Sequence, residues 1–430
     1  MGTRLTKRLL ESGHTIKIAD KRKSVTYPEL WLRCDVRNSG NETKEFPASL
    51  TDEAMAPGAD KIAKESQPMH SLLEVLKGSD VVVNLSAEHR DDVTPKSLYD
   101  EVNVKGSENI CKACAELGIH QIFFTSSVAV YGFAPIGTDE SGEIKYFNDY
   151  GRTKYLAEEK YREWLSSDMA NCATIIRPTV IFGEQNRGNV YNLLRQIAGG
   201  KFPMVGKGTN RKSMNYVENV AAFIQFCIEN EEKLPCFEKE YDGTSAGKQH
   251  LFNYCDEPAY DMNHLVLDCY KALGKPKTKL VHFPYWLAYF GGKCFDLLAF
   301  ILHKKFAVNS IRVKKFCQNT YFKSSRVPKI CFAAPVSFEE GLCRTIVYEF
   351  VKKVQGYAVN KYYCSIASCL DNEIHAFIFG LKKSVFCFVK SILIMPSFIS
   401  FRVKKPFGRV IISIFLSSSK DSHSLHFQGG

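Results

Sequence analysis

The chain has 430 residues, of which 45% are hydrophobic and 24% charged, a balance that excludes mainly disordered, collagen-like and coiled-coil proteins. It carries 57 Lys and Arg against 46 Asp and Glu, a net charge of +11, of which +6 lies in residues 358–430. Because the remaining body is only mildly basic, we do not expect a nucleic-acid protein whose whole surface contacts phosphates.

The cysteines and the apolar stretches suggest a cellular compartment. Fifteen cysteines are spread along the chain, their number is odd, and the first residues lack the apolar core of a signal peptide. We therefore expect reduced thiols in a cytoplasmic protein. Cys111 and Cys114 form a lone C-x-x-C inside a helical pattern, which favours core packing, and no metal site is expected. No charge-free stretch has the length and composition of a membrane span.

Strands and helices alternate along the first part of the chain. Helices are expected at 3–12, 72–76, 95–117 and 148–166, and strands at 15–20, 32–36, 80–85, 121–125 and 174–176. The 80–85 segment has three successive valines, 81–83, as parallel strands buried on both faces do. This order predicts an α/β fold, a Rossmann-type doubly wound parallel sheet, with a loop-rich segment at 38–68.

The pattern loosens after Gly183. Helices expected at 189–198, 217–230 and 261–273 are separated by loops rich in Gly and Pro, which indicates a smaller α/β substrate domain. The apolar helix expected at 285–302 contains Lys293 and Asp296 and is predicted to be core of that domain or an interfacial surface. We divide the chain into 1–185, 186–355 (interleaved with the first) and an unassigned basic, aromatic-rich tail, 356–430.

One set of residues carries recognisable chemistry. Tyr150 and Lys154 are four residues apart, on one face of a helix, and Ser127 follows an apolar strand upstream. A lysine ammonium near a phenol favours the phenolate, so Tyr150 can remove a proton from a substrate hydroxyl. A Y-x-x-x-K pair alone is common by chance, and the serine strand in an α/β chain makes it informative.

The chain resembles the extended short-chain dehydrogenase/reductase family of nucleotide-sugar epimerases and dehydratases. The resemblance runs from Gly2 to about Phe350. It rests on the segments TSSVAVYG at 125–132, NVKG at 103–106, RPTVIFG at 177–183 and the Tyr150/Lys154 pair. Segments 87–93, 183–192 and 310–316 are similar to a bacterial O-antigen epimerase branch. Members of that branch act on N-acetylglucosamine diphospho-undecaprenol or the corresponding UDP-sugar.

The resemblance implies NAD-dependent epimerisation at sugar C4 through a 4-keto intermediate. Tyr150 would take the proton of the 4-hydroxyl, Lys154 would bond the nicotinamide ribose, and Ser127 would orient the sugar oxygen. The implied cofactor-binding residues are Gly2, Asp20, Asp35, Val36, Leu85, Ala87, Asn103, Tyr150, Lys154 and Pro178. Asp20 favours NAD, whereas the basic run at 21–23 leaves a 2′-phosphate, and so NADP, open.

Several residues are expected to face the sugar or its diphosphate. These candidate substrate residues are Glu88, His89, Arg187, Asn189 and Arg211. Arginine suits a diphosphate because its planar fork bonds two oxygens at once. The alternative for each of them is an ordinary solvated loop residue.

Both ends depart from the family pattern. The dinucleotide fingerprint, a first strand followed by G-x-x-G-x-x-G, is matched only from its last glycine, Gly2, so we expect the central strand and two glycines to be absent. The tail has apolar-aromatic runs broken by basic residues at 376–383, 385–390 and 401–405. These runs suit a membrane surface, or else have no selected structure.

We therefore expect an NAD-dependent sugar 4-epimerase of surface-polysaccharide synthesis at the cytoplasmic face of the inner membrane, forming a homodimer through the helices that hold Lys105 and Tyr150. Two alternatives stay open. One is a dehydratase or reductase on the same scaffold, although dehydratases place Asp-Glu where Thr125 is followed by Ser126-Ser127. The other is a truncated, non-catalytic remnant that does not bind NAD.

Overall fold

The structure is a computed structural model. It describes residues 1–39, 68–90, 93–200, 202–236, 247–277, 279–302, 310–351 and 411–415. The expected loop segment at 38–68 and the three apolar-basic runs of the tail lie almost wholly outside these residues.

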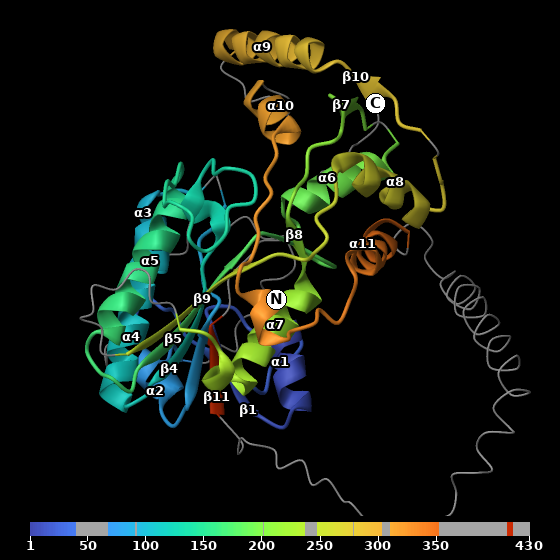
Figure 1. Ribbon diagram of the computed structural model, residues 1–430. Helices are drawn as coiled ribbons and strands as arrows, with labels where there is room; N and C mark the ends of the chain where they lie inside the picture. Colours follow the sequence, from blue (N-terminus) through green and yellow to red (C-terminus); the bar gives the residue numbers. More distant parts are fainter. Residues whose placement is uncertain are drawn as a thin grey trace, which may run out of the picture.

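A parallel sheet of seven strands forms the centre of the molecule (Figure 1). The strands in spatial order are β2 (Trp31–Arg33), β1 (Thr15–Asp20), β11 (Ile411–Phe415), β3 (Val81–Asn84), β4 (Gln121–Thr125), β5 (Cys172–Pro178) and β9 (Lys248–Tyr254). Every neighbouring pair is parallel. The predicted Rossmann-type α/β fold is confirmed.

The centre of the sheet holds a strand from the far end of the chain. Strand β11 lies between β1 and β3, with Ile412 opposite Ile16 on one side and Val81 on the other. The Ser413 hydroxyl is 2.8 Å from that of Ser79, and both groups are buried. The expectation of a sheet without its central strand is therefore wrong, because residues 411–415 occupy that position. Residues 411–415 of the unassigned tail are therefore part of the sheet, and the apolar-basic runs of the tail lie outside the described residues.

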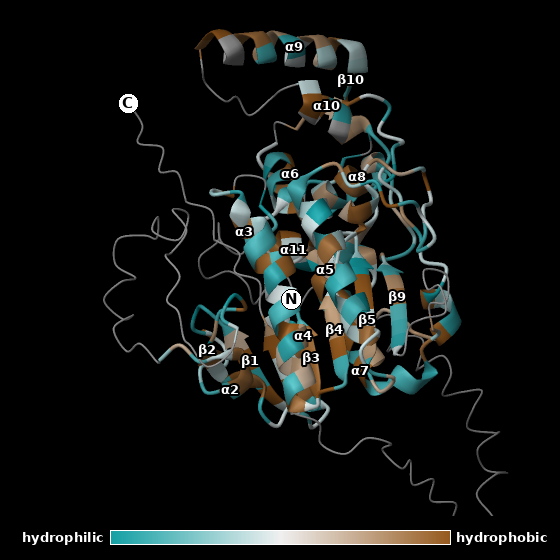
Figure 2. Ribbon diagram, turned by 90° about the vertical axis from the view of Figure 1, so that its left-hand side faces the viewer, coloured by the Kyte–Doolittle hydropathy of each residue, from teal (hydrophilic) through white to brown (hydrophobic). Residues whose placement is uncertain are grey.

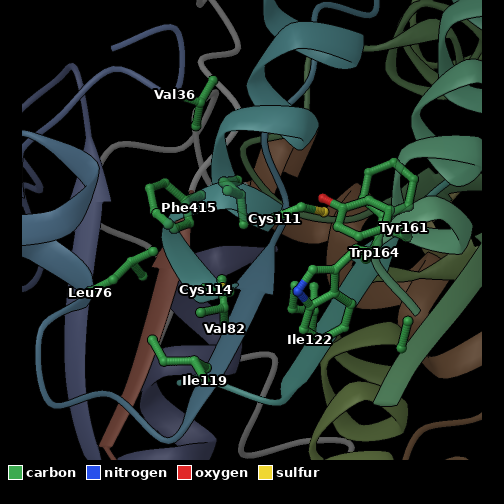
Figure 3. Packing of buried hydrophobic residues seen from close by; sticks show 14 of the residues in the cluster. Val36, Leu76, Val82, Cys111, Cys114, Ile119, Ile122, Tyr161, Trp164 and Phe415 are labelled. Atoms are coloured by element: carbon green, nitrogen blue, oxygen red, sulfur yellow. The ribbon is translucent and has the colours of Figure 1, made fainter. Parts of the chain in front are cut away.

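Helices cover both faces of the sheet and are held there by apolar side chains. Helices α1 (Gly2–Glu11) and α7 (Val217–Glu229) pack on one face, together with Ile412 and Ile414 of β11. Helices α2 (Leu72–Leu76), α4 (Gly106–Leu117) and α5 (Asp149–Leu165) cover the other face, where Phe415 lies (Figure 3). Alternate residues of β11 thus serve the two cores, as the twofold period of a strand requires.

Cys111 and Cys114 lie in the second of these cores, beside Val82 and Ile122 (Figure 3). Both are buried and carry no disulfide. The prediction that this C-x-x-C packs in the core is confirmed.

The helix expected at 95–117 is divided into three pieces. They are α3 (Ser97–Tyr99), a π-helical segment (Asp100–Lys105) and α4. The π-helical segment carries Asn103, whose amide nitrogen donates to the Glu88 carbonyl at 3.0 Å while its oxygen accepts from the Glu88 N–H at 2.8 Å. A π-helix has more residues per turn than an α-helix, and this wider turn lies where the Asn103 side chain holds the loop after β3.

Residues after Gly183, apart from α7, β9 and β11, build the smaller part of the molecule. Its core lies between α6 (Asn189–Ala198), α8 (Met262–Ala272) and α11 (Phe338–Ile346). The remaining short elements are β6 (Val180–Phe182), β7 (Met204–Val205), β8 (Met214–Tyr216), β10 (His282–Phe283), the 3-10 turns Val128–Tyr131, Glu231–Lys233 and Val327–Ile330, and the π-helical turn Val347–Val351.

Helix α9 (Tyr285–Leu302) lies at the outer end of this part, next to α10 (Ser310–Cys317) (Figure 1). Its predicted length is confirmed, but most of its large apolar side chains are exposed rather than buried. The prediction that it forms core of the smaller domain is therefore wrong. Within the described part of the chain, no helix combines the length and apolar character needed to cross a membrane.

The position of β11 makes a clear prediction about stability. Ile414→Asp puts a carboxylate at a fully buried position between two sheet neighbours. We expect it to lower the free energy of unfolding by about 3 kcal/mol or more, because burying an unpaired charge adds to the lost apolar contacts. Urea denaturation measures this, with the exposed Ile136→Asp as the matched control. Equal effects of the two substitutions would contradict the placement of β11.

A crosslink tests the register of β11 directly. In the double variant Ser79→Cys/Ser413→Cys, the two sulfur atoms replace hydroxyl oxygens 2.8 Å apart. We expect mild oxidation to join residues 79 and 413 in a disulfide, found by peptide mapping of the unreduced protein. A control variant, Ser79→Cys with Ile414→Cys, carries its second thiol on the opposite face of β11 and should not form that link.

Candidate active site

The carboxyl ends of β1, β11, β3, β4 and β5 share one edge of the sheet, and the predicted site residues gather there. Open parallel sheets bind their ligands at this edge. Asp20 ends β1, Ser127 follows β4, and Pro178 ends β5. Each of these side chains is therefore placed by the strand before it.

Tyr150 and Ser127 come together because two turns approach closely. Ser127 caps a short 3-10 turn, where its hydroxyl accepts from the Ala129 N–H at 3.1 Å. Helix α5 begins beside this turn, and a Cβ at Gly151 would lie 2.5 Å from the Ala129 carbonyl oxygen. Only glycine permits this approach, which places Tyr150 at the start of α5 beside the Ser127 turn. Burial raises the pKa of Tyr150, and the nearby Ser127 hydroxyl opposes the rise.

Lys154 lies one turn further along α5 and is almost fully buried. Its ammonium donates to the Thr125 carbonyl at 2.8 Å and to the Ser86 carbonyl at 3.4 Å. Burial lowers the pKa of Lys154 to about 7, against the attraction of Glu158. Two backbone carbonyls leave one of the three ammonium protons for a further acceptor.

A buried ion pair that the sequence analysis missed lies directly beneath this group. Arg177 binds Glu158 through two bonds, Nε to Oε1 at 2.9 Å and Nη2 to Oε2 at 2.6 Å, and both side chains are fully buried. Glu158 also accepts from Ser126 at 2.5 Å, while Arg177 donates to Tyr131 at 2.7 Å. The two residues before and after the Ser127 turn are thereby fixed. The sequence signal was Glu158 itself, four residues after Lys154 on the same helix face.

A pocket at this edge collects several of the predicted cofactor residues. It is lined by Ala19, Asp20, Lys21, Cys34, Asp35, Val36, Ser86, Ala87, Glu88, Val102 and Phe415. Asp20 accepts from the Arg22 N–H at 2.9 Å, and burial raises the pKa of its carboxyl to about 6. Asp35 holds a two-pronged ion pair with Arg37. Phe415 brings the tail strand β11 into the same wall.

The other predicted cofactor residues do not line this pocket. Leu85 is buried, and its N–H donates to the Phe415 carbonyl at 2.9 Å. The Asn103 amide is bonded to the Glu88 backbone and to the Thr153 hydroxyl at 2.9 Å. It therefore fixes the loop after β3, and we do not expect it to bind the cofactor directly. Gly2 is buried in the first turn of α1, and Pro178 is buried at the end of β5.

The predicted substrate residues are spread over three loops. Glu88 lines the pocket and His89 beside it is exposed. Arg187 forms an ion pair with the buried Glu349 at 2.8 Å and lies over the Tyr191 ring. Asn189 is exposed at the start of α6, and Arg211 is exposed with its N–H bonded to Asn319 at 2.7 Å. Arg187 would have to leave Glu349 to bind a diphosphate.

Three potential metal ligands gather away from this edge, at the amino end of β5. The ligand atoms of Cys172, Glu231 and His250 lie within 4.8 Å of one another. Hydrogen bonds connect them, since Cys172 Sγ and His250 Nε2 each lie 3.1 Å from Glu231 Oε1. These bonds account for the cluster without an ion, and the expected absence of a metal site stays a prediction.

Comparison with known proteins places this geometry in a family. Residues 1–239 match the model of the NAD dependent epimerase/dehydratase family. The chain is 44% identical over 352 residues to an N-acetyl-alpha-D-glucosaminyl-diphospho-ditrans,octacis-undecaprenol 4-epimerase of Escherichia coli O157:H7, covering 82% of this chain and 92% of the relative. It is 28% identical over 214 residues to a UDP-glucose 4-epimerase of Vibrio cholerae, covering 46% and 64%.

Solved structures agree on the fold. The UDP-N-acetylglucosamine 4-epimerase from Bacillus cereus superposes with a TM-score of 0.54 at 15% identity, covering 80% of this chain and 94% of that one. The UDP-glucuronic acid 4-epimerase from Bacillus cereus in complex with NAD gives 0.53 at 15% identity, covering 82% and 95%. With its parallel sheet, its Ser–Tyr–Lys group and these matches, the chain belongs to the NAD dependent epimerase/dehydratase family, and NAD is its cofactor.

Proposed function

We propose that this protein inverts C4 of an N-acetylhexosamine carried on a diphosphate, and that the carrier is a polyprenol. The observation that carries the proposal is the placement of Tyr150 beside Ser127, one helical turn from the buried Lys154. The carrier is suggested by the relative that is 44% identical and covers most of both chains. UDP is the alternative carrier, since it also presents a diphosphate and a sugar.

The residues present fit the cofactor. Asp20 and Asp35 stand at the pocket beyond β1 and β2, where a carboxylate suits the hydroxyls of a ribose. Lys154 retains an ammonium proton at the same edge and would donate it to the second ribose of the cofactor. Asp20 favours NAD over NADP because a 2′-phosphate would place negative charge against its carboxylate.

The chemistry divides between cofactor and protein. When bound at this edge, NAD would supply the hydride acceptor and donor for sugar C4. Tyr150 takes the proton of the 4-hydroxyl and later gives it back, while Ser127 holds the sugar oxygen by a hydrogen bond. Because burial raises the pKa of Tyr150, a charged Lys154 is needed nearby to stabilise the phenolate.

Two structural features bear on the rival functions. Ser126 donates to Glu158 and Ser127 lies beside Tyr150, so the two positions where dehydratases place Asp-Glu carry hydroxyls already used in positioning. A non-catalytic remnant was expected to lack the central strand, whereas β11 occupies that place. Both features support the epimerase over its alternatives.

We further propose that the enzyme acts as a homodimer at the cytoplasmic face of the membrane that holds its substrate. The predicted dimer helices, the 100–117 segment with Lys105 and α5 with Tyr150, pack on each other within one chain. Family resemblance suggests that a second copy adds its own pair to form a four-helix contact. Sedimentation equilibrium of the full chain tests this.

Substitution of Tyr150 tests the proposed reaction. Tyr150→Phe removes the proton acceptor and keeps the ring, so we expect 4-epimerisation to fall roughly 10²–10⁴-fold. Assays with N-acetylglucosamine on undecaprenyl diphosphate and on UDP, using one preparation, measure the activity and identify the carrier. Tyr146→Phe, four residues earlier and exposed, is the control. Undiminished epimerisation by Tyr150→Phe would refute the assigned chemistry.

The buried Lys154 predicts a pH dependence of stability. Its pKa in the folded state is about 7, below the ordinary value of 10.5, so folding below pH 7 carries the full cost of burying its charge. As pH rises from 7 towards 10, the folded lysine is neutral while the unfolded one still binds a proton, and that cost declines. Without cofactor, Lys154→Met should therefore gain most stability over the parent chain below pH 7, with the gain shrinking towards pH 10.

Urea denaturation of the cofactor-free protein at pH 6 and pH 9 measures the difference. The exposed Lys145→Met serves as the control and should show no such trend. A gain from Lys154→Met that is the same at both pH values would show that this lysine is not held in a state of lowered pKa.

A further inference from the structure

The outer helix α9 has an unusual surface. The four most exposed of its described apolar residues are Trp286, Phe290, Leu297 and Ile301, with 69%, 65%, 60% and 62% of their surface open. Their spacing of four, seven and four residues puts them on one face of the helix. A helix at a water-exposed surface normally turns its apolar face inward, whereas α9 turns this stripe outward. Figure 2 shows α9 at the extremity of the molecule with hydrophobic colour along it.

Further apolar groups are exposed on the other sides of α9 and next to it. They are Tyr285, Leu287, Phe295, Leu298 and Leu302 on α9, Phe283 just before it and Ile311 on α10. Isolated exposed apolar residues are ordinary, but so many on one helix mark an interaction site.

The charge around α9 identifies the partner. From residue 271 to residue 330 the sequence contains thirteen Lys or Arg and one acidic residue, Asp296. By contrast, residues 1–270 carry 32 basic and 39 acidic residues. Lys275, Lys277 and Lys279 before α9 and Lys293 within it are exposed. The positive charge of the body is therefore concentrated in the segment that contains α9, and four exposed lysines lie just before it or on it.

The single acidic residue of this segment is turned away from the stripe. Asp296 accepts from the Ser310 hydroxyl at 2.5 Å and from the Ser310 N–H at 3.4 Å, so it connects α9 to α10. Among the described residues of 271–330, this leaves no acidic side chain beside the stripe.

We propose that α9 docks onto an anionic lipid bilayer, with its apolar stripe among the acyl chains and its lysines at the headgroups. Trp, Phe and Leu on one face with Lys beside them are the residues of helices that lie in a membrane interface. Clustered lysines are attracted to anionic headgroups. A protein partner fits less well, because lysine is depleted in protein–protein interfaces.

The docked helix connects to the catalytic edge through α10. The chain leaves α10 at Cys317 and reaches Phe322, whose ring stacks on Tyr131 at 5.9 Å, and Tyr131 is bonded to Arg177. A hollow of about 420 Å³ lies along this path, between Tyr285 of α9 and the 205–210 loop. The inference rests on the proposed function in one respect: a sugar carried on a polyprenol is held in a membrane, so the enzyme would meet its substrate there.

Vesicle flotation of the full chain tests the proposal without any sugar substrate. We expect the protein to float with vesicles containing phosphatidylglycerol, and much less with pure phosphatidylcholine. The triple variant Phe290→Ser/Leu297→Ser/Ile301→Ser should bind at least about tenfold more weakly, since three buried apolar side chains are lost. The control triple Val25→Ser/Ile136→Ser/Met169→Ser removes equally exposed apolar groups elsewhere and should bind as the parent does.

Tryptophan fluorescence locates the contact. The chain has three tryptophans, and Trp31 and Trp164 are buried, so a blue shift on adding anionic vesicles reports Trp286. The shift should vanish in Trp286→Phe.

Three results would overturn the proposal. They are absence of vesicle binding, full binding by the α9 triple variant, and a Trp286 shift on concentrating the protein without lipid, which would mark contact with a second copy. None depends on catalysis. Loss of epimerase activity with intact vesicle binding would refute the proposed function alone.

Discussion

The pairing of β11 with both β1 and β3 is the constraint on which the catalytic edge depends. The ligand-binding edge of a parallel sheet keeps its geometry only if the carboxyl ends of adjacent strands are in register. Here the strand between β1 and β3 is formed by residues 411–415. Ile412 and Ile414 fill one core and Phe415 the other. Without this strand, β1 and β3 would each present an open edge, and Asp20 would lose its fixed position relative to Ser86.

Beneath the edge, fully buried polar groups set the positions of the residues above them. Glu158 and Arg177 are paired by two bonds in the interior and also hold Ser126 and Tyr131. Such pairs are costly to desolvate, and their value lies in fixing geometry as much as in stability. Lys154, by contrast, has no ion-pair partner in contact among the described residues: its ammonium bonds two backbone carbonyls and lies over the Phe124 ring, and burial lowers its pKa to about 7.

Sequence reasoning succeeded where the signal is local. Helix α5 and strands β1 and β4 follow from short apolar patterns, and the Tyr150/Lys154 pair is a one-turn spacing. It did not predict strand β9, because the buried residues of this strand include the polar Gln249, His250 and Asn253, so the apolar pattern of a buried strand is missing. It could not place β11 because its partners are more than 300 residues away in the sequence. For α9, apolar periodicity gave the helix but not which way its apolar surface faces.

Nicotinamide binding by the full chain is the most direct test of this account, because it requires β11, the Asp20 pocket and Lys154 together. We expect the purified protein to release NAD on acid treatment, or to bind about one NAD per chain on titration followed by calorimetry. Protein that is folded by circular dichroism and yet binds no NAD at saturation would contradict the account.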